Sequence, residues 1–304
     1  MPLFLIGYYL LLFFSGLLER KNEAVNIIFP RNSSWVILSP IEQRIKEKIE
    51  KVGVPLKEWD IRINYGIKTG CNEAFIIDKT KRDELIKQSP NSVDIIRPIL
   101  RGRDIKRYSY DFAELYLLNV HNGIREKNIP LVNIDDYPAI KTHLDQYWDK
   151  ISVRDDRGKT PYNLRNCAYM DDFSKQKIIY PNMTKYLPFV FDDKNFFVNQ
   201  KCFIITGQYI GFLTAFFNSS LFKYCFRDNF PELQGGTREL SKIFFETIPV
   251  IAIDDKIETN FLNAVKDIQN NYTHAKAILL DKMIFELYKL NQQEQNEIGF
   301  REIK

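Results

Sequence analysis

Residues 66–75 read Gly-Ile-Lys-Thr-Gly-Cys-Asn-Glu-Ala-Phe, with two glycines around a Lys-Thr pair. Apolar residues on both sides of this stretch predict a strand, a glycine loop and a second strand. Glycine tolerates positive φ and lets a partner approach the backbone, and Lys68, Thr69 and free backbone N–H groups suit a phosphate or a base edge. An ordinary hairpin with a polar tip is the competing interpretation. The loop is not a P-loop, because only three residues separate its glycines and Cys71 follows Gly70.

Further landmarks follow this stretch along the chain. Residues 96–105 read Ile-Arg-Pro-Ile-Leu-Arg-Gly-Arg-Asp-Ile. Later landmarks come in the order Tyr137-Pro138-Ala139, Arg154-Asp155-x-Arg157-Gly158, Tyr162-Asn163-Leu164-Arg165, Lys177-Ile178-Ile179-Tyr180-Pro181, Leu213-x-x-x-x-Asn218-Ser219 and Gly235-Gly236-Thr237. This ordered set resembles the TaqI-like specificity domain, the target-recognition part of adenine-N6 DNA methyltransferases and of fused restriction–modification enzymes. The resemblance implies that the chain binds double-stranded DNA, with Lys68, Thr69 and Asn72 of the first glycine loop among the contacts.

The composition limits the class of protein. The chain has 304 residues, of which 45% are hydrophobic and 14% aromatic, so an ordered core is expected. With 43 basic and 39 acidic residues the net charge is only +4, and any nucleic-acid surface must therefore be a local patch. The four cysteines form no C-x-x-C pair, which disfavours a zinc site or a disulfide framework and favours a reducing, cytoplasmic location.

Residues 3–18 form an apolar run that allows three interpretations: a membrane anchor or signal peptide, a buried helix, or a remnant of a larger gene. No basic residue precedes the run, and its length is at the lower limit for a spanning helix. We favour a remnant or buried helix for residues 1–20, and we expect no stable membrane partner. Residues 21–58 are a lead-in with one helix, which Ser39 caps and Pro40 begins.

A basic block lies between residues 97 and 107, where five cations oppose one acidic residue. Its local net charge of +4 equals that of the whole chain. We expect this block to face DNA, whereas the alternative is a solvated loop in which Asp104 pairs with an arginine. The cations are Arg97, Arg101, Arg103, Lys106 and Arg107.

Residues 152–166 predict a long polar loop, and loops of this length in compact domains are usually functional. Arginine suits guanine edges, asparagine suits adenine edges, and tyrosine can stack on a base. In the alternative interpretation, Arg154 and Arg165 pair with Asp155, Asp156, Asp171 or Asp172. The candidate DNA contacts of this loop are Arg154, Arg157, Lys159, Tyr162, Asn163 and Arg165.

Short apolar runs at 177–180, 189–191, 196–198 and 202–206 predict an antiparallel sheet, and Asn182 and Lys185 between the first two runs could reach DNA. Residues 210–226 predict a buried helix, and residues 243–248 a strand. Beyond residue 254 the chain reads as helices, with one apolar stripe from Ile257 to Ile268 and another at Leu279, Met283 and Leu287, and with a break near Asn270.

A second glycine loop comprises Gly235, Gly236, Thr237 and Arg238. In the family that the chain resembles, this loop lies beside the DNA-binding cleft. A flexible turn is the alternative interpretation.

The sequence lacks two motifs that adenine-N6 methylation needs. It has no Pro-Pro pair, such as the one that helps hold a flipped adenine, and no G-x-G cofactor loop. We therefore expect no cofactor on these residues, and S-adenosylmethionine in a missing domain or a partner subunit. A metal-dependent nuclease using Asp94, Asp104 and Lys106 is an alternative from another class.

Taken together, the sequence predicts an α+β fold with mixed or antiparallel sheets and packed helices. We expect a DNA target-recognition domain over residues 59–250 and C-terminal helices over 251–304. Its expected partners are double-stranded DNA and a methyltransferase or nuclease subunit. The chain would be a split subunit or a truncated gene product.

Overall fold

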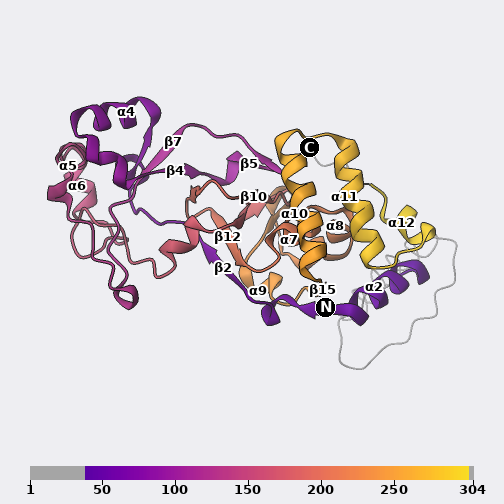
Figure 1. The fold of residues 1–304 in the computed structure, drawn as a ribbon. Coiled ribbons are helices and arrows are strands. Elements are labelled where there is room, and N and C mark those ends of the chain that lie inside the picture. The colour runs from indigo at the N-terminus through magenta and orange to yellow at the C-terminus, as the bar shows by residue number, and fades with distance from the viewer. Residues whose placement is uncertain (1–37, 301–304) are drawn as a thin grey trace, which may run out of the picture. The chain divides into compact units, whose positions relative to one another are not determined.

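The computed structural model describes residues 38–300 (Figure 1). The chain divides into two compact units, Met1–Glu47 and Lys48–Lys304. The predictions for residues 1–20 and for most of the lead-in lie outside the described residues. Helix α2 (Pro40–Val52) begins as predicted, since the Ser39 N–H donates to a Glu42 carboxylate oxygen at 2.7 Å and the Ser39 hydroxyl accepts from the Glu42 N–H at 3.3 Å.

The first of two four-stranded sheets in the larger unit has the strand order β10-β8-β12-β2, and all its pairs are antiparallel. The four strands are β2 (Ile61–Tyr65), β8 (Lys177–Pro181), β10 (Val190–Asp192) and β12 (Cys202–Gly207). Strand β8 is buried along its whole length, which suits its apolar sequence and its central place.

The second sheet has the order β11-β4-β7-β3 and is mixed, because β11 runs parallel to β4. Its strands are β3 (Ile76–Asp78), β4 (Ile96–Leu100), β7 (Leu115–Leu118) and β11 (Phe197–Val198). The two sheets together with the helices confirm the predicted α+β class.

One prediction about strand partners is wrong, and the structure also excludes the competing hairpin interpretation of the first glycine loop. The run at 196–198 does not join the antiparallel sheet of its neighbours, because β11 pairs with β4 in the second sheet. The first glycine loop is not a hairpin turn either. It connects β2 in the first sheet, through the short helix α3 (Asn72–Phe75), to β3 in the second sheet. Local periodicity identifies a strand, but it does not identify the strand beside it.

The chain passes between the two sheets several times, and two of these crossings lie against each other. One crossing is at Gly66 and Ile67, and the other runs from Val198 to Cys202. The Gly66 N–H donates to the Cys202 carbonyl at 2.9 Å, and the Ile67 N–H donates to the Val198 carbonyl at 2.8 Å. These hydrogen bonds tie the sheets together at the start of the glycine loop.

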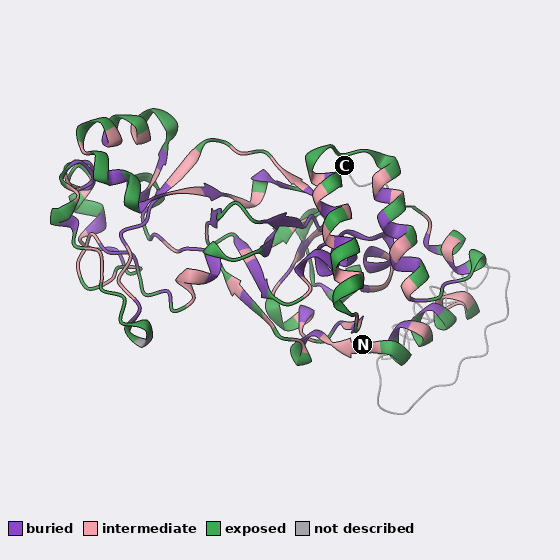
Figure 2. Cartoon of the chain, viewed as in Figure 1, coloured by how far each residue is buried: buried purple, intermediate pink, exposed green. Residues whose placement is uncertain are grey.

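Helices α4 (Lys79–Gln88), α5 (Pro138–Asp145) and α6 (Trp148–Ile151) accompany the second sheet, where α4 packs on β3 and β7. The predicted buried helix at 210–226 is two helices, α7 (Ile210–Asn218) and α8 (Ser220–Phe226). The break falls at Ser219, whose hydroxyl accepts from the Phe222 N–H at 3.0 Å and caps α8. Figure 2 shows both helices largely in the buried colour.

The C-terminal region is helical, as predicted: α10 (Asp255–Asn270), α11 (His274–Leu287) and α12 (Gln292–Ile298). Helix α10 packs on α7, and α10 ends at Asn270, at the predicted break. No helix among the residues described here is long and apolar enough to cross a membrane.

Two further predictions in this region are wrong. Residues 243–248 do not form a strand: α9 (Lys242–Phe245) comes first, and β15 (Pro249–Ile251) then pairs with β1 (Gly53–Pro55). The stripe at Leu279, Met283 and Leu287 is not the buried face of α11, because Leu279 is 55% exposed. The helix buries Ala277, Leu280 and Ile284 instead. Because α11 has apolar residues on more than one face, the helical spacing alone does not identify which face is buried.

Candidate nucleic-acid interface

A groove of about 620 Å³ lies between the basic block and the segment that follows β8. It brings the predicted Arg101, Arg103 and Arg107 together with Asn182 and Lys185, which lie about eighty positions further along the chain. No Asp or Glu stands among the described residues that line the groove. Its cationic lining residues are Arg101, Arg103, Lys106, Arg107, Lys185 and Lys201.

Three of these cations are exposed and have no side-chain hydrogen bond or ion pair within residues 38–300: Arg103, Lys185 and Lys201. Lys106 is also exposed, with its ammonium 3.6 Å from an Asp111 oxygen. Uncommitted cations on a wall without carboxylates attract anions, and the attraction is stronger in a groove than on a flat surface. The groove therefore suits a phosphate backbone.

Arg101 forms an ion pair with Asp104, as predicted by the alternative interpretation of the basic block. Its Nε and Nη2 donate to the two carboxylate oxygens at 3.0 and 2.8 Å, and its backbone N–H donates at 2.8 Å. Asp104 is only 4% exposed. Because both of its oxygens bind an arginine, Asp104 is poorly placed to hold a catalytic metal with Asp94. Within the described residues no group of three His, Cys, Asp or Glu side chains could hold a metal ion.

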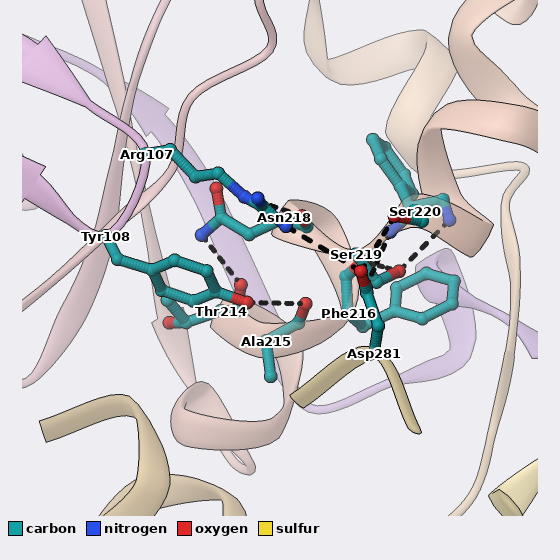
Figure 3. A network of polar contacts seen from close by, with 10 residues as sticks. Arg107, Tyr108, Thr214, Ala215, Phe216, Asn218, Ser219, Ser220 and Asp281 are labelled. Atoms are coloured by element: carbon teal, nitrogen blue, oxygen red, sulfur yellow. Dashed lines mark hydrogen bonds and ion pairs between the residues drawn. The ribbon is translucent and has the colours of Figure 1, made fainter. Parts of the chain in front are cut away.

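Arg107 lines the groove and is buried, and Figure 3 shows its side chain beside Asn218. Its guanidinium donates twice to the Asn218 carbonyl, at 3.2 and 2.8 Å, and lies 4.0 Å from a carboxylate oxygen of Asp281. That carboxylate also accepts from the N–H and the hydroxyl of Ser220, both at 2.7 Å. Arg107 thus supports the wall from behind, which corrects the expectation that it faces DNA.

The second glycine loop reaches the same groove through a small sheet. Strand β14 (Thr237–Glu239) pairs with β9 (Met183–Thr184), and a Cβ atom added to Gly235 would lie 4.0 Å from the Lys185 ammonium. Gly235 therefore lies near Lys185 at the edge of the groove, and Gly236 and Thr237 follow it directly. Arg238 is buried and donates to the Phe230 carbonyl at 2.9 Å and to Glu232 at 2.7 Å, so it folds the loop and has little surface to offer DNA.

A second basic surface forms where the first glycine loop packs against the 152–166 loop. Lys68 and Arg165 line one shallow depression together with Tyr65 and Tyr169. The Lys68 ammonium lies 5.3 Å from the centre of the Tyr65 ring, and Arg165 pairs with Asp156 at 3.0 Å, as the alternative for that arginine proposed. Asn72, at the end of the glycine loop, and Arg157 and Lys159, in the 152–166 loop, are exposed.

Three predicted contacts of these loops face inward. Thr69 is 2% exposed, and its hydroxyl donates to the Asn72 side chain at 2.7 Å. Asn163 is 1% exposed and donates to the Val132 carbonyl at 2.9 Å, so its amide cannot read an adenine edge. Arg154 is buried, and burial lowers its pKa to about 10, which leaves it protonated at neutral pH. These three residues shape the loops from within.

Three other candidates form hydrogen bonds within the protein. The Arg157 Nη1 donates to the Ser152 carbonyl at 2.6 Å, although the side chain is exposed. The Tyr162 hydroxyl donates to Asp145 at 2.5 Å, and burial together with that carboxylate raises its pKa to about 12. Arg97 does not line the groove: its guanidinium donates to the carbonyls of Asp94 at 2.6 Å and Ile96 at 3.0 Å.

The sequence analysis missed Lys201 and Tyr186. Lys201 is a single lysine before β12, and Tyr186 is 56% exposed in the segment after β9. Neither belongs to a charged run or a glycine loop. They lie near the basic block because of strand pairing, which no local sequence pattern predicts.

Comparisons with known proteins show which family the chain resembles. A family model described as the TaqI-like C-terminal specificity domain matches residues 97–250. The type II methyltransferase M.BstVI of Geobacillus stearothermophilus is 24% identical over 288 residues, which are 91% of this chain and 48% of that protein. The chain thus spans about half the length of the curated relative that it matches.

Two solved structures are also similar. The type IIL restriction–modification enzyme MmeI, solved in complex with DNA, has a TM-score of 0.58 and 13% identity, over 80% of this chain and 35% of its own. The type IIG restriction endonuclease BpuSI has a TM-score of 0.49 and 16% identity, over 83% of this chain and 34% of its own. The likeness to MmeI shows a shared fold.

Proposed function

Because this chain belongs to the family of TaqI-like C-terminal specificity domains, we propose that it binds double-stranded DNA as the target-recognition part of a restriction–modification enzyme that methylates adenine at N6. The observation that carries the proposal is the groove. Arg103, Lys185 and Lys201 converge there without partners among the described residues and without a lining carboxylate. In a chain of net charge +4, such a concentration of cations is a local feature.

The proposed division of roles follows from the two basic surfaces. The groove neutralises phosphates, a contact that gives affinity without sequence information. The surface of the first glycine loop and the 152–166 loop carries the partly exposed Lys68 and the exposed Arg157 and Lys159. Arginine and lysine can read base edges as well as bind phosphates, and we assign the discrimination between sequences to this surface.

Catalysis is proposed to lie outside these residues. The chain has neither a Pro-Pro motif nor a G-x-G loop, and a flipped adenine needs a pocket that holds its amino group. A further domain or a partner subunit would bind S-adenosylmethionine and transfer the methyl group. That second contact surface would also increase the affinity for DNA.

The test is to incubate the purified chain with labelled S-adenosylmethionine and a mixed-sequence duplex, alone and with a candidate methyltransferase subunit. We expect duplex binding at low salt by the chain alone, and labelled adenine only in the combined reaction. A triple variant with Arg103, Lys185 and Lys201 each changed to Glu should lose duplex binding. Methyl transfer by the chain alone, or a lack of duplex binding at low salt, would refute the proposal.

A further inference from the structure

Arg154 connects the first glycine loop to the 152–166 loop. Its Nη1 donates to the carbonyls of Thr69 and Asp156, the latter at 2.5 Å, and its Nη2 donates to those of Pro161 at 3.1 Å and Asn163 at 2.6 Å. Only Thr69 belongs to the glycine loop, so one guanidinium joins two segments about eighty-five positions apart.

The surroundings of this guanidinium fix its position from a third side. Its central carbon lies 4.4 Å from the centre of the Phe75 ring, and the residue is 6% exposed. Gly70 allows the close approach of the loops, since a Cβ atom there would lie 3.1 Å from the Asp156 Cβ. All four acceptors are backbone carbonyls and none is a carboxylate. These hydrogen bonds therefore depend on the directions of the N–H donors more than on ion pairing.

A lysine could not replace these contacts. The guanidinium is planar and holds its donors in a rigid fork, whereas an ammonium has three donors on one atom at the end of a flexible stem. Each of the two terminal nitrogens of Arg154 donates to two carbonyls, whereas the three donors of an ammonium would leave at least one of the four carbonyls unpaired. The charge itself would be kept.

We infer that Arg154 is a positioning residue for specificity: it holds the two loops as one surface, so that Lys68, Arg157 and Lys159 meet the base edges together. This inference rests on the proposed function. Base readout needs side chains placed within about 0.5 Å, whereas phosphate contacts in the groove do not depend on these loops. Loss of the Arg154 contacts therefore impairs discrimination and spares general affinity.

The experiment compares the wild type with Arg154→Lys and with Val265→Ala. Val265 is fully buried in α10, which packs on α7 and α11, so its variant controls for a general loss of stability. A preferred duplex is first selected from a random pool with the wild-type chain. Dissociation constants for the preferred and a random duplex, melting temperatures and amide hydrogen exchange of residues 67–72 are then measured.

For Arg154→Lys we expect the ratio of the two dissociation constants to fall at least tenfold, random-duplex affinity to stay within twofold, and amide exchange in the glycine loop to accelerate. For Val265→Ala we expect an unchanged ratio. An unchanged ratio in Arg154→Lys, or an equal fall in Val265→Ala, would overturn the inference while the proposed function stands. If the wild type selects no preferred sequence, the proposed function is refuted, and the role of Arg154 that rests on it is refuted as well.

Discussion

Gly66 and Asn199 meet backbone to backbone: a Cβ atom added to Gly66 would lie 2.2 Å from the Asn199 carbonyl oxygen. These two residues mark the point where the chain crosses twice between its two main sheets. The adjoining Ile67 forms a parallel bridge with Asn199. The requirement for glycine at position 66 therefore comes from this contact and not from a turn.

Replacement of Gly66 by Ala should destabilise the fold. A methyl group at that distance from a carbonyl forces the two crossings apart, and overpacking of this kind costs about 1–3 kcal/mol. The free energy of unfolding from urea titrations checks this. Gly102→Ala is the control, because its added Cβ would lie 3.4 Å from the nearest atom, and its effect should stay within about 0.5 kcal/mol. Equal losses in the two variants would contradict the crossing argument.

The groove predicts a set of salt dependences. Arg103→Ala, Lys185→Ala and Lys201→Ala should each weaken binding to all duplexes alike and reduce the slope of log K against log salt by about 0.9. Lys256→Ala on α10 supplies a control with the same loss of charge away from the groove. If the slopes stay unchanged in all three groove variants, these residues do not contact DNA phosphates.

Neighbouring residues of the 152–166 loop should behave differently from each other. Arg157 is exposed, and its replacement by Ala should cost about 1–3 kcal/mol of discrimination at one base pair with little change in stability. Asn163 is buried, and Asn163→Ala should lower the free energy of unfolding by about 1–3 kcal/mol, because the Val132 carbonyl loses its donor. Thermal melts combined with competition binding distinguish the two effects. The distinction fails if Arg157→Ala destabilises the fold as much as Asn163→Ala.

His143 predicts a dependence of stability on pH. One ring nitrogen lies 3.0 Å from the Ala74 carbonyl, and burial lowers the pKa of the imidazole below its usual value of 6.5. The unfolded chain therefore binds the proton first as the pH falls. The contribution of His143 to stability is complete above about pH 6.5 and is lost as the pH falls from there through the folded-state pKa.

A variant can isolate this effect. His143→Gln keeps a donor for Ala74 but cannot titrate, so the fall of stability between pH 7 and pH 5 should become shallower, by up to about 1.4 kcal/mol per pH unit. His121, whose pKa burial also lowers, still contributes in both proteins. His274→Gln changes an exposed histidine and should match the wild type. A slope for His143→Gln equal to that of the wild type would show that His143 does not carry this dependence.

Residue patterns along the chain are sufficient to predict the local elements. Strands β7, β8 and β12, the capped start of α2 and the helices beyond residue 254 all lie where residue patterns placed them. These features depend on contacts between residues a few positions apart, which a linear pattern records. The pairing of Arg101 with Asp104 is local in the same sense, and it too was among the alternatives.

Which polar residues face the solvent depends on the tertiary structure and cannot be read from local sequence. Arg103 and Arg107 are four positions apart in one basic block, yet the first is exposed in the groove and the second supports it from behind. Arg154 and Arg157 differ in the same way. The physical reason is that an arginine suits phosphates, base edges and buried carbonyls equally well. Which of them it meets depends on strand pairing between segments about eighty residues apart, and that pairing leaves no trace in local spacing.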